Sequence, residues 1–226
     1  MLRIENRVGM PESKTSSTDS PELCVDPEHY KSYTKQISYR WNSRGFRDDE
    51  WPDDLSDVVW CVGDSFTVGI GQPFEETWPS LLQKRLGKRC LNLGEDGCSN
   101  DTMCLRIQEI CRLYNPKTIA VMWSYLSRRR KHNKNVQYDR DDFGDKEDIT
   151  NFIKNYKIIN QLPTSVINLM IPNAITHPDI LNYFLEKEFK KNFKLIYVEQ
   201  IDRARCGIHF DIKTSENVTK SIIQNM

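Results

Sequence analysis

The chain has 226 residues and no net formal charge, with 32 basic and 32 acidic side chains. This length fits one α/β domain with a sizeable core. The balanced charge gives no indication of a nucleic-acid partner or of an anionic membrane surface. The longest apolar runs have the length of strands, so we expect no membrane span.

The N-terminus and the cysteines indicate where the chain is made. The start, Met1–Arg7, lacks the apolar region of a signal peptide. The seven cysteines are odd in number and contain no C-x-x-C pair, which indicates free thiols made in a reducing cytoplasm. The four histidines show no ligand spacing, so we expect no metal site, and no motif requires a cofactor.

The first quarter of the chain differs in composition from the rest. Residues 1–25 are rich in Ser, Thr, Pro and charge, which predicts a flexible N-terminal arm that orders only against a protein partner. Residues 26–57 mix aromatic and charged residues around the turn at 42–45, which favours an extended strap or hairpin on the main domain. The main domain is expected to span 58–226.

The main domain is organised around the stretch 58–69, which reads V-V-W-C-V-G-D-S-F-T-V-G. Such an apolar run with β-branched residues is typical of a strand buried on both faces. Gly63 permits a tight exit from the strand, and a helix can begin at Ser65, where amide groups favour negative charge. Ser65 is then placed for nucleophilic attack. The same residues also suit an ordinary turn in which the serine only caps a helix.

Alternating apolar runs and helical spacing continue to the C-terminus. Further strands are expected at 89–93, 118–123, 165–170 and 195–198, and helices at 74–86, 103–114, 149–159, 180–185 and 218–223. This order predicts an α/β fold: a three-layer α/β/α sandwich, flavodoxin-like, with five parallel strands. Such sheets place their sites beyond the carboxyl ends of the strands.

The charged stretch 128–148 begins with a basic block and continues with an acidic one. The simplest interpretation is a solvated loop that neutralises itself. The alternative is that its arginines line the mouth of the site and hold an anionic group of the substrate.

Three short segments resemble the sequence blocks of the SGNH or GDSL hydrolases. Residues 63–69 look like the first block, the lead-in 39–47 is similar to a segment that precedes it in some members, and 207–209 have the placement of the last block. The resemblance implies that Ser65 is the nucleophile and His209 the general base. It also implies that the amides of Ser65 and Gly97 stabilise the oxyanion. Read without the resemblance, His209 is a surface or capping histidine.

Two positions depart from the family's pattern. Leu126 stands where the third block has an oxyanion-binding asparagine, and Cys206 stands where the last block has the aspartate that orients the histidine. An active enzyme then needs substitutes. The candidates are Ser124, Ser127 and Arg128 for the oxyanion, and Asp202, Asp211, Glu199 or a backbone carbonyl for the histidine.

The resemblance predicts a serine ester hydrolase that acts on a small ester, such as an O-acyl group on a glycan, through an acyl-enzyme. The alternative is a catalytically degenerate structural or binding protein. The lead-in and altered third block look similar to SGNH-domain proteins encoded by tailed phages, so this alternative includes incorporation into a virion. A phosphate- or nucleotide-binding flavodoxin-like domain is a third interpretation, but no Gly-rich phosphate motif occurs where it should.

Overall fold

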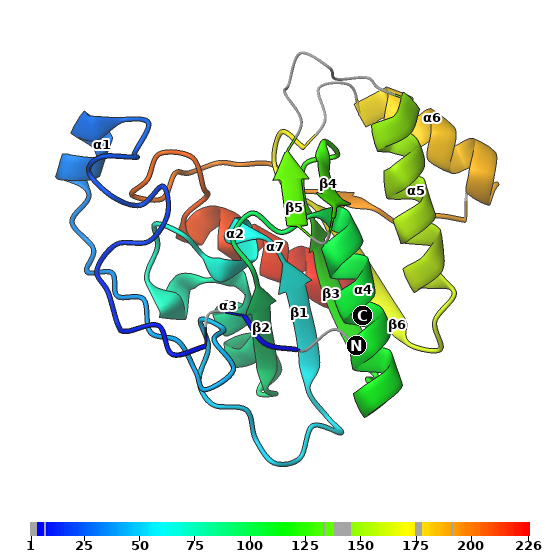
Figure 1. Ribbon diagram of the computed structural model, residues 1–226, viewed down its shortest axis with the longest axis horizontal. Helices are drawn as coiled ribbons and strands as arrows, with labels where there is room; N and C mark the ends of the chain where they lie inside the picture. Colours follow the sequence, from blue (N-terminus) through cyan, green and yellow to red (C-terminus); the bar gives the residue numbers. More distant parts are fainter. Residues whose placement is uncertain (1–3, 7, 133, 138–145, 175–177, 191) are drawn as a thin grey trace.

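The computed structural model describes residues 4–6, 8–132, 134–137, 146–174, 178–190 and 192–226 (Figure 1). Its main sheet has the strand order β2-β1-β3-β6-β7, and every pairing in it is parallel. The strands are β1 (Val59–Gly63), β2 (Cys90–Gly94), β3 (Thr118–Trp123), β6 (Ser165–Met170) and β7 (Ile196–Tyr197). The predicted five-stranded parallel α/β fold is confirmed.

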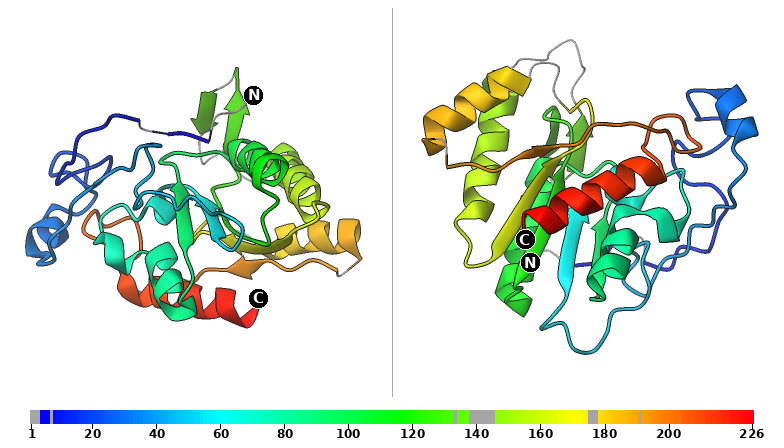
Figure 2. Two further views of the ribbon diagram at one scale, coloured as in Figure 1. Left: turned by 90° about the horizontal axis from the view of Figure 1, so that it is seen from below. Right: turned by 180° about the vertical axis from the view of Figure 1, so that it is seen from behind.

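The strands are buried because helices cover both faces of the sheet. Helix α3 (Trp78–Leu86) packs against α7 (Ile212–Gln224) on one face, and α4 (Asn100–Tyr114) packs against α5 (Lys146–Asn160) on the other, with α6 (Pro178–Phe189) beside α5 (Figure 2). All five residues of β1 and of β2 are buried. The edge strand β7 has only two residues, fewer than predicted, and Tyr197 in it is exposed.

The first predicted helix, 74–86, is two elements in the structure. A 3-10 turn, η1 (Phe74–Glu76), is followed by the extended residue Thr77, and α3 begins at Trp78. The break has a local cause, because Pro79 is tolerated only in the first turn of a helix. Helix α7 is longer than the short final helix that the sequence predicted.

The N-terminal quarter lies along the outside of the main domain. Residues 26–57 contain helix α1 (Pro27–Ser32) and then run extended through the turn at 42–45, where the amide of Gly45 donates to the carbonyl of Asn42. Backbone bonds between Ser13 and Tyr39 join the arm to this strap. Within the arm, Asp19 has no exposed surface and accepts hydrogen bonds from Arg205 and Tyr39. The described part of the arm therefore packs on its own chain.

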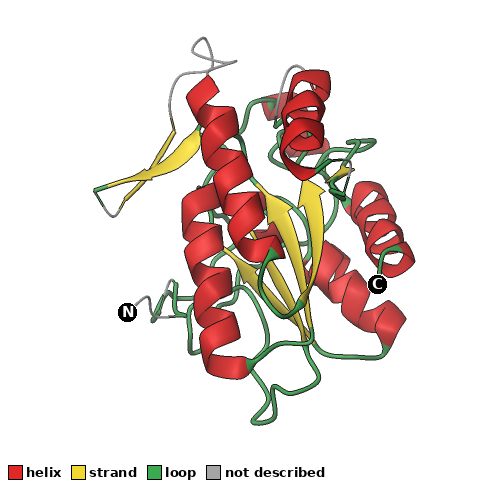
Figure 3. Ribbon diagram, turned by 90° about the vertical axis from the view of Figure 1, so that its right-hand side faces the viewer, coloured by secondary structure: helices red, strands yellow, loops and turns green. Residues whose placement is uncertain are grey.

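The stretch 128–148, interpreted as a loop, instead begins with an antiparallel hairpin. Strands β4 (Arg128–Lys131) and β5 (Lys134–Gln137) pair with each other and project away from the main sheet (Figure 3). Asn135 anchors the hairpin, since its side-chain oxygen accepts from Ser99 and Thr102 at the start of α4. Residues 138–145 of the acidic block lie outside the described residues, and 147 and 148 belong to α5.

All seven cysteines are free thiols. Across the described residues, every helix is too short or too polar to cross a bilayer.

Candidate active site

Ser65 lies where the strand order of the sheet reverses. Strand β1 is flanked by β2 and β3, and the helices that follow β1 and β3, α3 and α5, lie on opposite faces of the sheet. The carboxyl end of β1 is thus the kind of switch point at which such sheets place their sites. There the short helix α2 (Ser65–Val68) begins. Gly63 and Gly94 let α2 come close, because a Cβ at Gly63 would lie 2.0 Å from Thr67 Oγ1 and one at Gly94 2.3 Å from the Val68 nitrogen. The small residues at both strand ends thus seat the helix that carries Ser65.

The structure brings together the serine and histidine that the sequence singled out. Ser65 Oγ lies 2.8 Å from His209 Nε2, although the residues are 144 positions apart. His209 Nδ1 lies 3.1 Å from Cys206 Sγ. The thiol therefore occupies the position at which a triad carboxylate would contact the imidazole.

The hydrogen bonds of these three side chains form one consistent chain. If Ser65 donates its hydroxyl proton to Nε2, the proton of the neutral imidazole is on Nδ1 and is donated to Cys206 Sγ. The thiol can then donate to the carbonyl of Ile70, 3.9 Å away. In this arrangement Nε2 is free to accept a proton, which is the tautomer that a triad aspartate stabilises.

Burial keeps these groups neutral. His209 is 4 % exposed, and burial lowers the pKa of its imidazole to about 4. Burial raises the pKa of the Cys206 thiol, against weaker opposing hydrogen bonds from backbone amides. Near pH 7 the imidazole is therefore an available base, and Cys206 is a thiol acceptor rather than an anion.

A buried ion pair lies directly behind the nucleophile. Asp64 accepts from the backbone amide of Phe66 and so caps α2, while its other oxygen accepts from Ser124 Oγ at 2.6 Å and from Arg128 at 3.0 Å. Burial raises the pKa of Asp64, and the charge of Arg128 opposes this shift. Arg128 thus compensates the carboxylate that fixes the first turn of α2.

Two backbone amides are suited to bind an oxyanion. Ser65 is the first residue of α2, where an N–H group has no partner within the helix. The amides of the next three residues of α2 all bond to Asp64. Gly97 stands just before α4 with a φ of 71°, which favours glycine. Among the described residues, neither the Ser65 amide nor the Gly97 amide has a hydrogen-bond acceptor.

The proposed oxyanion substitutes are held in different ways. Leu126 is buried at 3 % exposure. The Ser124 hydroxyl is used by Asp64, and its backbone amide donates to Asn100. Ser127 is also buried, with a hydroxyl that has no hydrogen-bond partner among the described residues. Of the three substitutes, Arg128 is thus the one that carries a charge, and its guanidinium bonds the carboxylate of Asp64, the residue before Ser65.

The candidate carboxylates for His209 are used elsewhere. Asp211 accepts from the hydroxyl of Tyr33 and from the ammonium of Lys35. Asp202 accepts from the first backbone amides of α7 and from the Thr214 hydroxyl. The imidazole is thus oriented by Cys206 rather than by either aspartate.

The loop that carries Cys206 and His209 is held by distant parts of the chain. Arg205 pairs with the buried carboxylate of Asp19 in the arm, and its backbone amide donates to Gly71. His29 of α1 bonds the carbonyl of Ala204. These supports could not be predicted from the sequence, because the partners are separated by more than 130 positions and share no motif.

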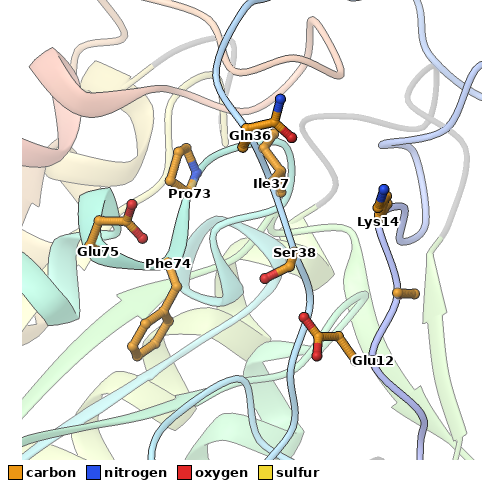
Figure 4. A pocket seen from close by; sticks show the side chains of 9 residues that line it. Glu12, Lys14, Gln36, Ile37, Ser38, Pro73, Phe74 and Glu75 are labelled. Atoms are coloured by element: carbon orange, nitrogen blue, oxygen red, sulfur yellow. The ribbon is translucent and has the colours of Figure 1, made fainter.

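The described cavities lie away from the two catalytic candidates. A cavity of about 550 Å³ lies between the arm at Glu12–Lys14, the strap at Gln36–Ser38 and the segment Pro73–Glu75 (Figure 4). Neither Ser65, which is 3 % exposed, nor His209 lines this cavity. The Ser65 hydroxyl therefore has little access to solvent.

Comparison with known proteins identifies the fold. No protein-family model and no curated protein matches the chain. Among solved structures, TesA superposes with a TM-score of 0.50 at 14 % identity, over 74 % of this chain and 97 % of its own. A G-D-S-L family protein from Desulfitobacterium hafniense DCB-2 superposes with a TM-score of 0.50 at 13 % identity, over 76 % of this chain and 100 % of its own. These likenesses confirm the predicted fold.

Proposed function

We propose that this chain, which has the fold of the SGNH/GDSL hydrolases, is a serine ester hydrolase that uses Ser65 as nucleophile and His209 as base. One observation carries the proposal: Ser65 Oγ and His209 Nε2 lie 2.8 Å apart while the other ring nitrogen contacts Cys206. A nucleophile bonded to an oriented base is the arrangement that acyl transfer requires.

The chemistry follows from this arrangement. Nε2 takes the hydroxyl proton as Oγ attacks the ester carbonyl, and the Ser65 and Gly97 amides stabilise the developing oxyanion. The imidazolium then protonates the leaving alcohol, which leaves an acyl-enzyme. A water molecule activated by the same imidazole releases the acid. The narrow access at Ser65 favours a small ester, such as an acetyl group on a glycan.

A fluorophosphonate probe tests the proposal, because it reacts with activated serines. We expect labelling at Ser65 that is abolished in Ser65→Ala and strongly reduced in His209→Gln. Hydrolysis of a small activated acetate ester should be lost in the same two variants. A folded wild-type protein whose Ser65 is not labelled would contradict the proposal.

One observation favours a second candidate, a binding or structural protein that retains the hydrolase fold. Ser65 and His209 are only 3 % and 4 % exposed, so the dyad reaches solvent through very little surface. Under this alternative the dyad is a buried hydrogen-bonded pair with a structural role. Ser65→Ala would then lower the unfolding temperature without removing any activity.

A further inference from the structure

A basic groove lies next to the β4–β5 hairpin, and neither Ser65 nor His209 lines it. It has a volume of about 510 Å³ and runs between α4 and α5 under the β4–β5 hairpin. Its wall includes three permanent cations, Arg129, Arg130 and Lys154, together with His132, whereas Asp101 is its one carboxylate. Four of these five side chains can therefore face a ligand as hydrogen-bond donors.

The ion pairs divide these cations into two kinds. Arg129 pairs with Asp148 and Glu147 at the start of α5, so its charge is compensated. Within the part of the chain that the structure describes, Arg130 and Lys154 have no carboxylate partner. Two cations that converge on one groove repel each other, and a bound anion would remove that repulsion.

Two further polar side chains line the groove, Asp101 and Asn151. The carboxylate of Asp101 already accepts from the backbone amide of Arg130 at 2.7 Å and from the Asn155 side chain at 2.9 Å. The side-chain nitrogen of Asn151, on the groove's wall, is buried and has no acceptor among the described residues. This nitrogen is covered by protein atoms, so a ligand in the groove meets the charges of Arg130 and Lys154 rather than Asn151.

The hairpin connects the groove with the nucleophile. Its first residue, Arg128, bonds Asp64 next to Ser65, and Arg130 follows two positions later in the same strand. Two residues of a β-strand span ~6.6 Å. A substrate on which Ser65 acts would therefore have to extend along β4, past Arg128, to meet the cations of the groove.

We propose that this groove binds a phosphate- or sulfate-type group and that this group belongs to the ester on which Ser65 acts. The second half of the proposal rests on the proposed hydrolase function. Arg130 and Lys154 supply the charge that holds it. A guanidinium and an ammonium together bind a tetrahedral phosphate or sulfate group better than they bind a single carboxylate.

The test measures anion binding and turnover separately. Binding of inorganic pyrophosphate to the Ser65→Ala protein is followed by calorimetry, which needs no catalysis. The double variant Arg130→Gln/Lys154→Gln should weaken binding by about tenfold or more, since it removes both uncompensated cations. The matched control, Lys84→Gln/Arg85→Gln, removes the same two charges from exposed positions of α3 and should bind as Ser65→Ala alone does.

Equal affinity in the two double variants, or no pyrophosphate binding at all, would overturn the proposal. In the second arm, kcat/KM is compared for acetate esters of glycerol and of glycerol phosphate, with Ser65 intact. The groove variant should lower kcat/KM for the phosphorylated ester alone, and an equal loss for both esters would refute the link to the substrate. Failure of the hydrolase function is recognised separately, as absent fluorophosphonate labelling, and the calorimetric result stands without it.

Discussion

The contact between Cys206 and His209 allows the proposed catalytic dyad to be improved by one substitution. Replacing Cys206 with Asp puts an anion at the position from which Sγ now accepts the Nδ1 proton at 3.1 Å. The carboxylate would stabilise the imidazolium that forms when Ser65 attacks. We therefore expect Cys206→Asp to be more reactive than the wild-type protein.

The size of the gain follows from the two kinds of hydrogen bond. A bond to a charged group contributes ~1.5–3 kcal/mol, and a neutral one ~0.5–1.5 kcal/mol. The difference of about 1.4 kcal/mol corresponds to about tenfold in rate. In serine proteases, loss of the triad carboxylate costs ~10⁴. We expect a much smaller gain in rate here, because the loss in the proteases includes a wrong imidazole tautomer. In this site Cys206 Sγ already lies where it can accept the Nδ1 proton of the correct tautomer.

The assay is the second-order rate constant for fluorophosphonate labelling of Ser65, and Cys206→Asn is the matched control. Asparagine has the shape of aspartate and shares any packing cost around the buried Cys206 site, but it brings no charge. Cys206→Asn should react no faster than the wild type, and Cys206→Asp about tenfold faster. If the folded Asp variant labels no faster than the Asn variant, the reasoning that Cys206 occupies the orienting position is refuted.

Three further predictions concern the surroundings of the dyad. Burial holds the pKa of His209 at about 4, and only the neutral imidazole accepts a proton. Labelling of Ser65 should therefore rise through about pH 4 and be constant above about pH 5. A labelling midpoint near pH 6.5 would contradict the burial argument. The same shift makes the unfolded state bind more protons between about pH 4 and 6.5, so the unfolding free energy should fall with decreasing pH in this window by more in the wild type than in His209→Gln. Asp19→Ala leaves the mostly buried Arg205 without its carboxylate, so we expect a loss of about 3–5 kcal/mol in denaturant unfolding, while Glu22→Ala at an exposed arm position should change little.

The sheet and its order could be predicted because its signals are local. Each strand of the core is an apolar run bounded by small or polar residues, as in Val59–Gly63, and each crossover helix has apolar residues at helical spacing. The nucleophile could be proposed for the same reason, since the turn at Gly63–Ser65 follows the first strand directly. The base depended on the family resemblance, because a single histidine carries no local pattern.

The hairpin and the arm could not be predicted because their stabilising contacts are far apart in sequence. Strand β4 is wholly basic, Arg128–Lys131, which on local grounds reads as a solvated loop. It is anchored through Arg128 to Asp64, 64 positions earlier. The arm has a disordered composition, yet Asp19 is buried by Arg205, 186 positions later. A polar segment is thus ordered by specific ion pairs rather than by apolar area.

Asn100 is a further residue that the sequence analysis missed. Its side chain accepts from the Ser124 amide and donates to the carbonyls of Ser124 and Tyr125. It thereby fixes the chain that follows β3, where the third family block would lie. The local signal was a Ser99 cap before a helix, which predicts the helix start but not a tertiary contact.

The departure from the family's last block at Cys206 is consistent with the charges of the site. The site already contains one buried anion, Asp64, whose cost is offset by Arg128 and Ser124. An aspartate at position 206 would add another buried anion, and within the described residues Arg128 is the cation whose charge lowers the pKa of His209. A thiol orients the imidazole without that second charge, so the neutral dyad and the single Asp64–Arg128 pair are mutually consistent. The thiol makes Ser65 less reactive than an aspartate would, but it avoids a further buried anion. The reactivity gained by Cys206→Asp should therefore be accompanied by lower stability than in Cys206→Asn.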